Sequence, residues 1–597
     1  YYIFMGYVQF ANYIIKTMNY TEEVQKQRKE GFKKKGATSR IQMLKDTKIG
    51  FNNRVIRRIR NEFNNRLIVI DEVHNIRKTD DNENKKVAVN LELLVRSAQN
   101  MRFLLLSATP MYNSYKEIVW ILNLMNTNDR RARVETKNIF DKNGNLKKNG
   151  EEMLIRKATG YISFVRGENP YTFPYRVYPS EFAKDKTFPA IEYPSYQMNL
   201  KKIKHEDKKR ILSLYLTQLS DCRTCGKCQF CVYKYIIYTL RNKQFSITTR
   251  TGVVKEMPSF ENMESFGYTL LQTPLESLII SYPVQGLKEL LDEIPSEPMS
   301  DEFSQSFSEM SSKDVDEEII NDDDEVITGP IEEVVEEETA DKDTSHTLLD
   351  TSIEEHEITT KALVGGRHID PHLLTGRIGL ERMMSFVDIR SPPEKGNYEY
   401  RRATLDNYGR IFSREQIGHY SVKIKAIIDN IVDSEGIVLI YSQYLDSGLI
   451  PVALALEEMG FTRYGDNGAK PLFKTPPSPV VDVRTMKPPH NKSDFAPARY
   501  VLITGETRLS PNNDFEVKGA TGDDNRDGKK VKVILISKAG SEGIDFKFIR
   551  QVHVLEPWYN MNRVEQIIGR AVRNFSHKDL PFEKRNVEIF MYGTILG

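Results

Sequence analysis

The chain has 597 residues, with 85 Lys and Arg, 83 Asp and Glu, and a formal net charge of +2. This length exceeds what one hydrophobic core fills, so several structural units are expected. No apolar run approaches the roughly 18 residues that a membrane-spanning helix needs, and the first residues lack the basic region and initiating Met of a signal peptide.

From its start, the chain alternates helical patterns with short apolar runs. RLIVID and RFLLLSAT are typical of strands that are buried on both faces of a parallel sheet. VNLELLVRSAQNM, which lies between them, has the length and apolar spacing of a crossover helix. Residues 1–158 therefore predict an α/β lobe.

The middle of the chain is irregular. Residues 159–298 are rich in Pro and aromatic residues and hold all four cysteines in CRTCGKCQFC. This clustering argues against a secreted disulfide scaffold and favours a reducing compartment.

A strongly acidic tract follows. Residues 300–343 contain 18 acidic residues and two lysines, a charge of −16, so the rest of the chain carries about +18. Such a tract cannot bury enough apolar surface to fold, which predicts a disordered linker over 299–360 and a connecting segment over 361–420. The basic remainder favours polyanionic partners, although lysines scattered over a large surface would give the same total.

A second alternating region covers residues 421–597. Four strand candidates rich in Val and Ile are GIVLIYSQY, YVLITG, KVILISKAG and RQVHVLEPW. Helices are predicted in GLIPVALALEEMGF and MNRVEQIIGRAVRNF. The predicted fold class is α/β, with two lobes of parallel sheet flanked by helices and a large irregular or helical insertion between them.

Polar residues follow both predicted strands of the first lobe. Asp71 and Glu72 come directly after LIVI, and Ser107 and Thr109 follow the next strand. Open α/β sheets bind ligands at the carboxyl ends of their strands, where one acid can hold Mg²⁺ and its neighbour can orient an attacking water. The alternative is a helix N-terminus, with Asp71 as its cap and Glu72 in its first turn.

One predicted helix near the C-terminus carries two arginines. Gln566, Arg570 and Arg573 are spaced at i, i+4 and i+7, which places them on one helical face. Two arginines on such a face are suited to stabilising charge on a transferring phosphoryl group. An amphipathic helix with a solvated basic face is the alternative.

Four segments in series resemble motifs of superfamily 2 helicases: DEVH at 71–74, SAT at 107–109, ISKAGSEGID at 536–545 and QIIGRAVR at 566–573. SATPMYNS and LEPWYNMNRVEQIIGR are similar to the Swi/Snf-type branch, whose members translocate on duplex DNA. FVRGENPYTFPYRVYP and RNFSHKDLPFEKRNVEIFMY resemble helicases of nucleocytoplasmic large DNA viruses, most of all the mimivirus-like members. That group includes the small subunit of the poxvirus early transcription factor and nucleoside triphosphate phosphohydrolase I.

The resemblance implies two RecA-like lobes that use ATP and Mg²⁺. In the first lobe it assigns Asp71 to the metal, Glu72 to activation of water, and His74, Ser107 and Thr109 to coupling. In the second lobe it assigns phosphate contacts to Arg570 and Arg573. It assigns nucleotide or coupling roles to Gly543, Asp545 and Gln566, with Asp545 either contacting the ribose or bracing the arginine helix. It assigns contacts with the nucleic-acid backbone to Thr504, Gly505, Ser541 and Glu542.

The sequence departs from the family in one respect. Superfamily 2 enzymes hold the nucleotide phosphates in a Gly-rich loop with a Lys and a Ser or Thr. GKC at Gly226 and GKK at Gly528 lack both the hydroxyl and the preceding strand. We therefore expect the loop to lie upstream in a longer protein, and the 597-residue chain alone to be a poor ATPase.

The expected function is that of an ATP-dependent helicase or translocase of a large DNA virus that acts in viral transcription. The alternative is a DNA-binding subunit of a viral early transcription factor with a secondary or vestigial ATPase. Expected partners are nucleic acid, with double-stranded DNA favoured, and subunits of a viral RNA polymerase or transcription factor. The expected location is the virion and the viral factory in the host cytoplasm.

The four cysteines form a separate candidate site. Cys222, Cys225, Cys228 and Cys231 follow the pattern C-x₂-C-x₂-C-x₂-C. A structural Zn²⁺ with four sulfur ligands is the first interpretation. An iron–sulfur cluster is the second, because closely spaced cysteines can also surround a cubane. A chance cluster of free thiols is the third.

Overall fold

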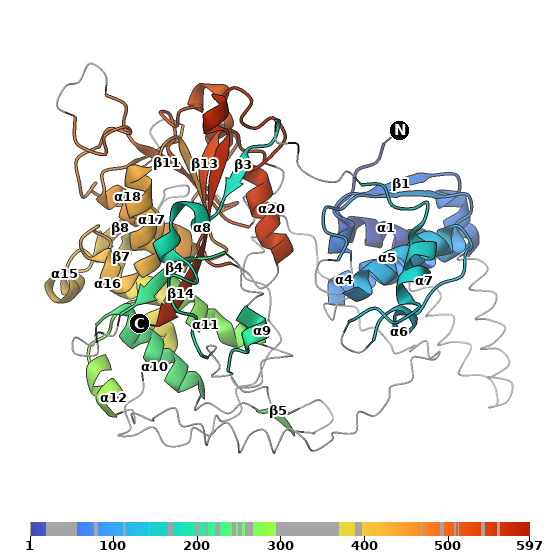
Figure 1. Cartoon of the computed structure of the whole chain (residues 1–597), viewed down its shortest axis with the longest axis horizontal. Coiled ribbons are helices and arrows are strands. Elements are labelled where there is room, and N and C mark those ends of the chain that lie inside the picture. The colour runs from blue at the N-terminus through green and yellow to red at the C-terminus, as the bar shows by residue number, and fades with distance from the viewer. Residues whose placement is uncertain are drawn as a thin grey trace, which may run out of the picture. The chain divides into compact units, whose positions relative to one another are not determined.

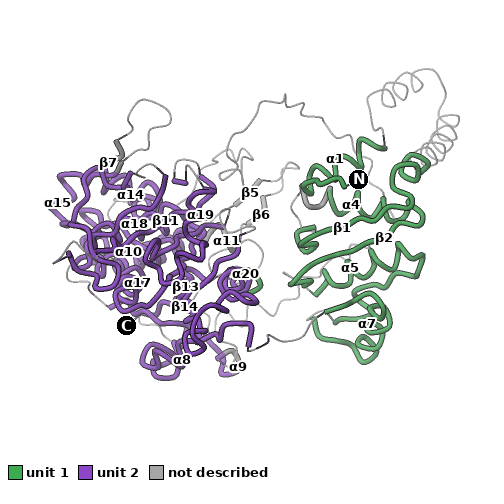
Figure 2. The backbone as a smooth tube through the Cα atoms, turned by 90° about the horizontal axis from the view of Figure 1, so that it is seen from above, with its two compact units in different colours: residues 1–167, 559–563 green, residues 168–558, 564–597 purple. Residues whose placement is uncertain are grey.

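The computed structural model describes residues 2–18, 56–76, 82–111, 115–141, 144–164, 169, 171–196, 202–208, 213–220, 222, 227–241, 246–248, 254–256, 267–293, 369–387, 397–466, 470–489, 495–506, 509–510, 513–538, 544–557 and 561–596. The chain divides into two compact units, which Figure 2 colours green and purple. Unit 1 comprises residues 1–167 and 559–563, and unit 2 comprises residues 168–558 and 564–597. The acidic tract predicted over 299–360 lies outside the described residues. Within the described part of the chain, no helix is both long and apolar enough to cross a membrane.

Unit 1 is built on two parallel strands, β1 (Leu67–Ile70) and β2 (Arg102–Leu105), which pair in register. The predicted crossover helix between them is α4 (Asn82–Ser97). Residues 56–63 form a further helix. The remaining elements are α1 (Tyr7–Met18), η1 (Val73–Asn75), α5 (Tyr115–Asn128), α6 (Thr136–Ile139) and α7 (Gly150–Ala158).

The two faces of this small sheet differ in burial. Ile70 lies in a hydrophobic core with Phe63, Leu91 and other residues of the surrounding helices. On the opposite face Leu67 and Val69 are 62% and 52% exposed. The expectation of strands buried on both faces is therefore wrong for unit 1, because within the described residues the covering helices pack on one face only.

Unit 2 contains a larger parallel sheet in the order β10-β11-β12-β9-β13-β14-β3. Every residue of β9 (Ile437–Tyr441) and β12 (Val533–Ile536) is buried, as expected of central strands covered by helices on both faces. Their neighbours are β10 (Thr462–Arg463), β11 (Arg499–Ile503) and β13 (Ile549–Val554). All four predicted strands of the second lobe are present, and the predicted α/β class is confirmed (Figure 1).

The predicted insertion over 159–298 does not form a region of its own. Its strands β3 (Tyr175–Val177) and β4 (Tyr215–Leu219) both pair with β14 (Asn586–Leu596), which is long enough to pair with β3 near its start and β4 near its end. The predicted connecting segment over 361–420 is likewise part of this unit, because Met383 and Phe412 lie in its main core. Unit 2 therefore assembles its sheet from strands far apart in the sequence.

Helices and short elements complete unit 2. Helix α17 (Val422–Asp433) begins at Ser421, whose Oγ accepts a hydrogen bond from Ile424 N at 2.9 Å. The nine residues of α18 (Ile450–Glu458) are all buried. Helix α20 (Met561–Ala571) belongs to unit 2 from Val564 onward. The others are α8 (Pro179–Phe182), η2 (Lys184–Lys186), α9 (His205–Lys208), α10 (Gln229–Arg241), β5 (Ser246–Thr248), β6 (Val254–Glu256), α11 (Gly267–Ile279), α12 (Leu287–Glu293), η4 (Pro371–Leu374), α14 (Gly376–Met383), β7 (Met384–Val387), β8 (Asn397–Tyr400), α15 (Arg402–Tyr408), α16 (Ile417–Tyr420), η5 (Leu445–Leu449), α19 (Asn513–Thr521), η6 (Asp523–Asn525) and η8 (Phe582–Lys584).

Candidate functional site

In unit 1, the two acids predicted to be catalytic lie at the carboxyl end of β1. Asp71 is exposed, and its Oδ1 accepts a hydrogen bond from Glu72 N at 3.0 Å. Glu72 has left-handed backbone angles, φ 46° and ψ 51°, and precedes the short helix η1 without capping it through its side chain. Asp71 is therefore not the helix cap that the alternative interpretation required. A hydrogen bond from the Tyr7 hydroxyl to Asp71 O, at 2.7 Å, also holds this strand end and has no signal in the sequence motifs.

His74 connects the two strand ends of unit 1. The residue is only 4% exposed, and its Nδ1 lies 2.9 Å from Ser107 Oγ and 3.4 Å from Thr109 Oγ1. Nδ1 also lies 3.2 Å from Glu72 Oε2, a contact that lacks hydrogen-bond geometry. The structure thus brings Glu72, His74, Ser107 and Thr109 together at one edge of the sheet.

The loop after β2 is held by the same hydroxyl that faces His74. Ser107 Oγ accepts a hydrogen bond from Thr109 N at 3.0 Å. Val73 N donates to Leu106 O at 3.0 Å, which fastens the segment after β1 to the end of β2. A shift of one strand end would therefore move the other, as a coupling role requires.

In unit 2, Arg573 is held by two contacts. Its Nη1 forms an ion pair with Asp545 Oδ1 at 2.7 Å, and its Nε donates to Gly569 O at 3.1 Å. Of the two roles considered for Asp545, the structure contains the bracing contact. Gln566 and Arg570 lie on α20 and are partly buried, and no acidic side chain of the described residues pairs with the Arg570 guanidinium.

The expectation that Gln566, Arg570 and Arg573 share one helical face is wrong for Arg573. Helix α20 ends at Ala571, two residues before this arginine. Ser576 Oγ accepts a hydrogen bond from Arg573 N at 3.4 Å, and His577 Nε2 donates to Ile549 O at 2.7 Å. Arg573 is thus positioned by a turn after α20 that these hydrogen bonds hold, and not by the periodicity of the helix.

The predicted nucleic-acid residues differ in exposure. Thr504, directly after β11, is 2% exposed, and Glu506 N donates to its Oγ1 at 3.3 Å. The Thr504 side chain is therefore used inside its own turn, and contact of this residue with nucleic acid stays a prediction. Gly505 is exposed and has a φ of 78°. Ser541, Glu542 and Gly543 lie outside the described residues.

A buried polar group at the ends of β9 and β13 was not predicted. Glu556 accepts hydrogen bonds from Ser442 Oγ, at 3.0 Å, and from the backbone N of Gln443. Lys423 donates to Leu555 O at 3.0 Å; burial lowers its pKa to about 8, and the Glu556 charge opposes that shift. The sequence does contain a signal for this polar group, because polar residues follow both strands in GIVLIYSQY and RQVHVLEPW.

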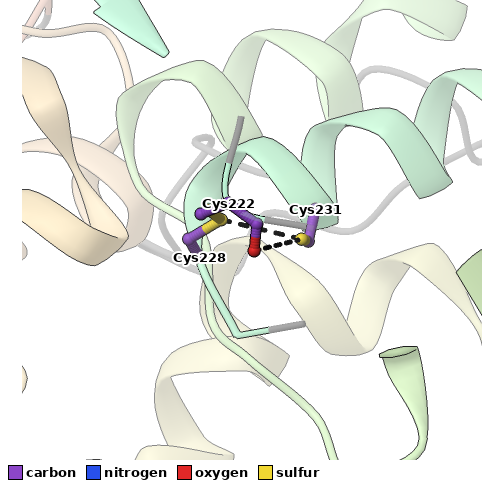
Figure 3. A group of neighbouring side chains, drawn as sticks. All are labelled: Cys222, Cys228 and Cys231. Carbon is purple, nitrogen blue, oxygen red and sulfur yellow. Dashed lines mark hydrogen bonds between the residues drawn. A yellow bond between two sulfur atoms is a disulfide. The ribbon is translucent and has the colours of Figure 1, made fainter. Parts of the chain in front are cut away.

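The described cysteines also converge. Cys222, Cys228 and Cys231 place their sulfur atoms within 4.8 Å of one another (Figure 3). Cys225 lies outside the described residues.

Comparison with known proteins finds a helicase domain largely within unit 2 and several viral relatives. Residues 516–575 match the helicase conserved C-terminal domain, a segment that includes β12, β13 and all of α20 and ends just after Arg573. The termination factor NPH-I homolog of African swine fever virus is 34% identical over 181 residues, 29% of this chain and 26% of that protein. A protein of Acanthamoeba polyphaga mimivirus with the name "Putative ATP-dependent RNA helicase" is 21% identical over 554 residues, 87% of this chain and 36% of that protein.

A third relative carries a nucleoside triphosphatase name. Nucleoside triphosphatase I of Heliothis armigera entomopoxvirus is 42% identical over 90 residues, 15% of this chain and 14% of that protein. The matches thus span from about a seventh to about a third of each relative. They support the resemblance inferred from the motifs: residues 516–575, largely in unit 2, match a helicase C-terminal domain, and the chain is similar to proteins of large DNA viruses with termination-factor, helicase and nucleoside triphosphatase names.

Proposed function

We propose that this chain forms part of an ATP-driven helicase or translocase of a large DNA virus that acts in viral transcription. The observation that carries the proposal is the convergence of Glu72, His74, Ser107 and Thr109 at the carboxyl end of a parallel strand pair. Carboxylates and hydroxyls at such an edge are suited to a phosphorylated ligand and its metal ion. The match of residues 516–575 to a helicase domain supplies independent support.

The residues of unit 1 fit the roles of metal binding and water activation. Asp71 is exposed at the strand end, where a carboxylate can hold Mg²⁺ directly or through water. Glu72 stands beside it, partly exposed, and can orient a water molecule for attack on the γ-phosphate of ATP. His74, fixed between Ser107 and Glu72, would transmit a change at the nucleotide to the loop after β2.

The residues of unit 2 fit the role of charge stabilisation. Arg573 is held by Asp545 and by a backbone carbonyl, so its guanidinium is ordered before any ligand binds. An ordered guanidinium loses little conformational freedom when it contacts a phosphate. We propose that Arg573 and Arg570 stabilise the transferring phosphoryl group, so that the two units serve one reaction.

The partner we propose is nucleic acid, with double-stranded DNA favoured by the resemblance to the Swi/Snf-type branch. Subunits of a viral RNA polymerase or transcription factor would be further partners. The proposed location is the virion and the viral factory. Because the 597 residues contain no phosphate-loop motif, we also propose that hydrolysis requires a phosphate-binding loop beyond these residues' own motifs.

ATP hydrolysis by the natural protein that contains this chain, measured with and without DNA, tests the proposal. We expect DNA to raise the rate, and Glu72→Gln to bind ATP but to lose turnover. Glu135→Gln is the matched control, because Glu135 is an exposed acid of the same unit and its ion pair with Lys137 is also exposed. A protein that binds promoter DNA tightly but does not hydrolyse ATP would support the transcription-factor subunit instead.

A further inference from the structure

The cysteine segment lies at a junction in unit 2. It lies between β4, which extends the main sheet by pairing with β14, and α10. Cys228 directly precedes α10, and Cys231 lies in its first turn. A cross-link between these cysteines would fix the angle between β4 and α10.

Three sulfur atoms converge at this junction. Cys228 Sγ and Cys231 Sγ lie 3.6 Å apart, and Cys231 Sγ lies 3.8 Å from the carbonyl oxygen of Cys222. Cys222 Sγ and Cys228 Sγ lie within bonding distance and are paired as a disulfide in this structure, and the Cys231 side chain is buried beside them. All three sulfurs nevertheless fit within one 4.8 Å cluster.

We propose that Cys222, Cys228 and Cys231 bind a structural Zn²⁺. Four ligands at a Zn–S distance of about 2.3 Å form a tetrahedron whose edges are about 3.8 Å, close to the separation of Cys228 and Cys231. A disulfide explains why two of the three sulfur atoms lie close together, whereas one metal ion explains the positions of all three. An iron–sulfur cubane would separate the cysteine sulfur atoms by the width of the cluster. That separation is larger than the 4.8 Å within which these three sulfur atoms lie.

The electrostatics of the junction favour thiolates. Cys228 and Cys231 are at the N-terminus of α10, where the unpaired backbone N–H groups stabilise negative charge. The two residues are 5% and 0% exposed. Buried thiolates without a cation would be costly, so a bound metal would offset the burial of their charge.

The site would act as a structural link rather than as a catalyst. Gln229, next to Cys228, donates from Nε2 to Ser277 O at 2.8 Å and accepts at Oε1 from Val422 N at 2.9 Å. These bonds join the start of α10 to α11 and to α17. Leu287 and Leu290 of α12 share a hydrophobic cluster with Cys228 and Cys231. A metal at this point would therefore hold four helices and the extra strand β4 in place.

Metal analysis of the whole 597-residue chain, purified under reducing and anaerobic conditions, tests the proposal. We expect about one zinc ion per chain. Cys231→Ser should lose it, whereas Ser220→Ala, an exposed change in the same connection, should keep it. Cys225 lies outside the described residues and is not part of the proposed site.

Because Cys231→Ser could also disturb folding, a second measurement uses the unaltered chain. After reduction and removal of metal by a chelator, Co²⁺ is added as a spectroscopic probe. We expect an intense thiolate-to-cobalt charge-transfer band that added Zn²⁺ abolishes, together with protection of the cysteines from alkylation. Iron with sulfide in the purified chain would overturn the proposal. The proposal would also be overturned if the reduced chain bound neither Zn²⁺ nor Co²⁺ and formed the Cys222–Cys228 disulfide on reoxidation.

Discussion

At the residue scale, the least expected feature is the backbone of Glu72. A non-glycine residue at φ 46° costs about 1–2 kcal/mol relative to a right-handed conformation. Such conformations cluster at functional sites, where the surrounding structure imposes them. Here the hydrogen bond from Glu72 N to Asp71 and the contact of its carboxylate with His74 restrain the turn.

Two substitutions at this position test the backbone conformation separately from the carboxylate. Both Glu72→Asn and Glu72→Val remove the acid, but Asn tolerates the left-handed region and a β-branched side chain does not. We expect Glu72→Val to be less stable than Glu72→Asn by about 1 kcal/mol or more in urea unfolding. Equal stability of the two variants would contradict the left-handed turn.

Arg573 is the residue on which the proposed chemistry of unit 2 depends. Arg573→Ala should lower the turnover of ATP by about 10³–10⁵, as loss of an arginine finger does. Asp545→Asn should lower it much less, because the exposed ion pair between them contributes about 1 kcal/mol or less. Turnover and DNA affinity should be measured on both variants. An Arg573→Ala protein that loses only DNA affinity would place this arginine on the nucleic-acid surface.

The motifs predicted which residue types would gather, but not how each would be buried. Asp71, Glu72, His74 and Ser107 could be grouped because the ends of parallel strands meet at one edge of a sheet. Burial of Thr504 could not be predicted, because it depends on where Ser510 and Glu506 fold back in the same turn.

At the element scale, the turn after α20 is sensitive to acid. Burial lowers the pKa of His577 to about 4, and its neutral ring donates from Nε2 to Ile549 O. In the unfolded chain the same group titrates near pH 6.5. As the pH falls below about 6.5, the unfolded state binds a proton that the folded state does not, so stability falls until the pH reaches about 4.

This shift predicts a loss of about 3 kcal/mol in the free energy of unfolding between pH 6.5 and 4 from His577 alone. His577→Gln keeps a side-chain donor but cannot titrate, so it should lose less stability over that range than the unaltered chain. The exposed His372→Gln is the control for the loss of a histidine outside this turn. Identical profiles for His577→Gln and the unaltered chain would show that His577 titrates normally.

Elements with strong local signals were the ones that the sequence predicted. The central strands of unit 2 are continuous Val and Ile runs, and α4 and α18 have helical lengths. The strand β3 was missed because its short mixed sequence, YRV, carries no clear period, and β4 was missed because it lies in KKRILSLYLTQLSD, whose pattern predicts a helix. Their partner β14 lies hundreds of residues away, so only the folded chain reveals the pairing.

At the scale of the whole molecule, charge bears on the proposed partner. Outside the acidic tract, the chain carries about +18 by composition. If basic residues contact backbone phosphates, binding releases counterions and weakens steeply as salt increases. We expect DNA affinity to fall strongly between 50 and 200 mM salt, as described for proteins with several phosphate contacts, and to vary little with sequence. Tight binding to one promoter element that survives high salt would favour the transcription-factor alternative.

The division into two units could be predicted from the two alternating regions, but the composition of unit 2 could not. Its sheet takes strands from the predicted insertion, so the boundary near residue 298 has no counterpart in the fold. Insertion of one chain segment into the sheet of another depends on tertiary pairing, which hydrophobic periodicity does not encode.

The central proposal is that Glu72 and Arg573 serve one ATPase reaction. It is tested most directly by the DNA-stimulated turnover of ATP in the natural protein with Glu72→Gln, Arg573→Ala and both changes together. Residues that act in one transition state are not additive, so the double variant should be about as slow as the slower single variant. Normal turnover in either single variant, or losses that simply multiply in the double variant, would contradict the account.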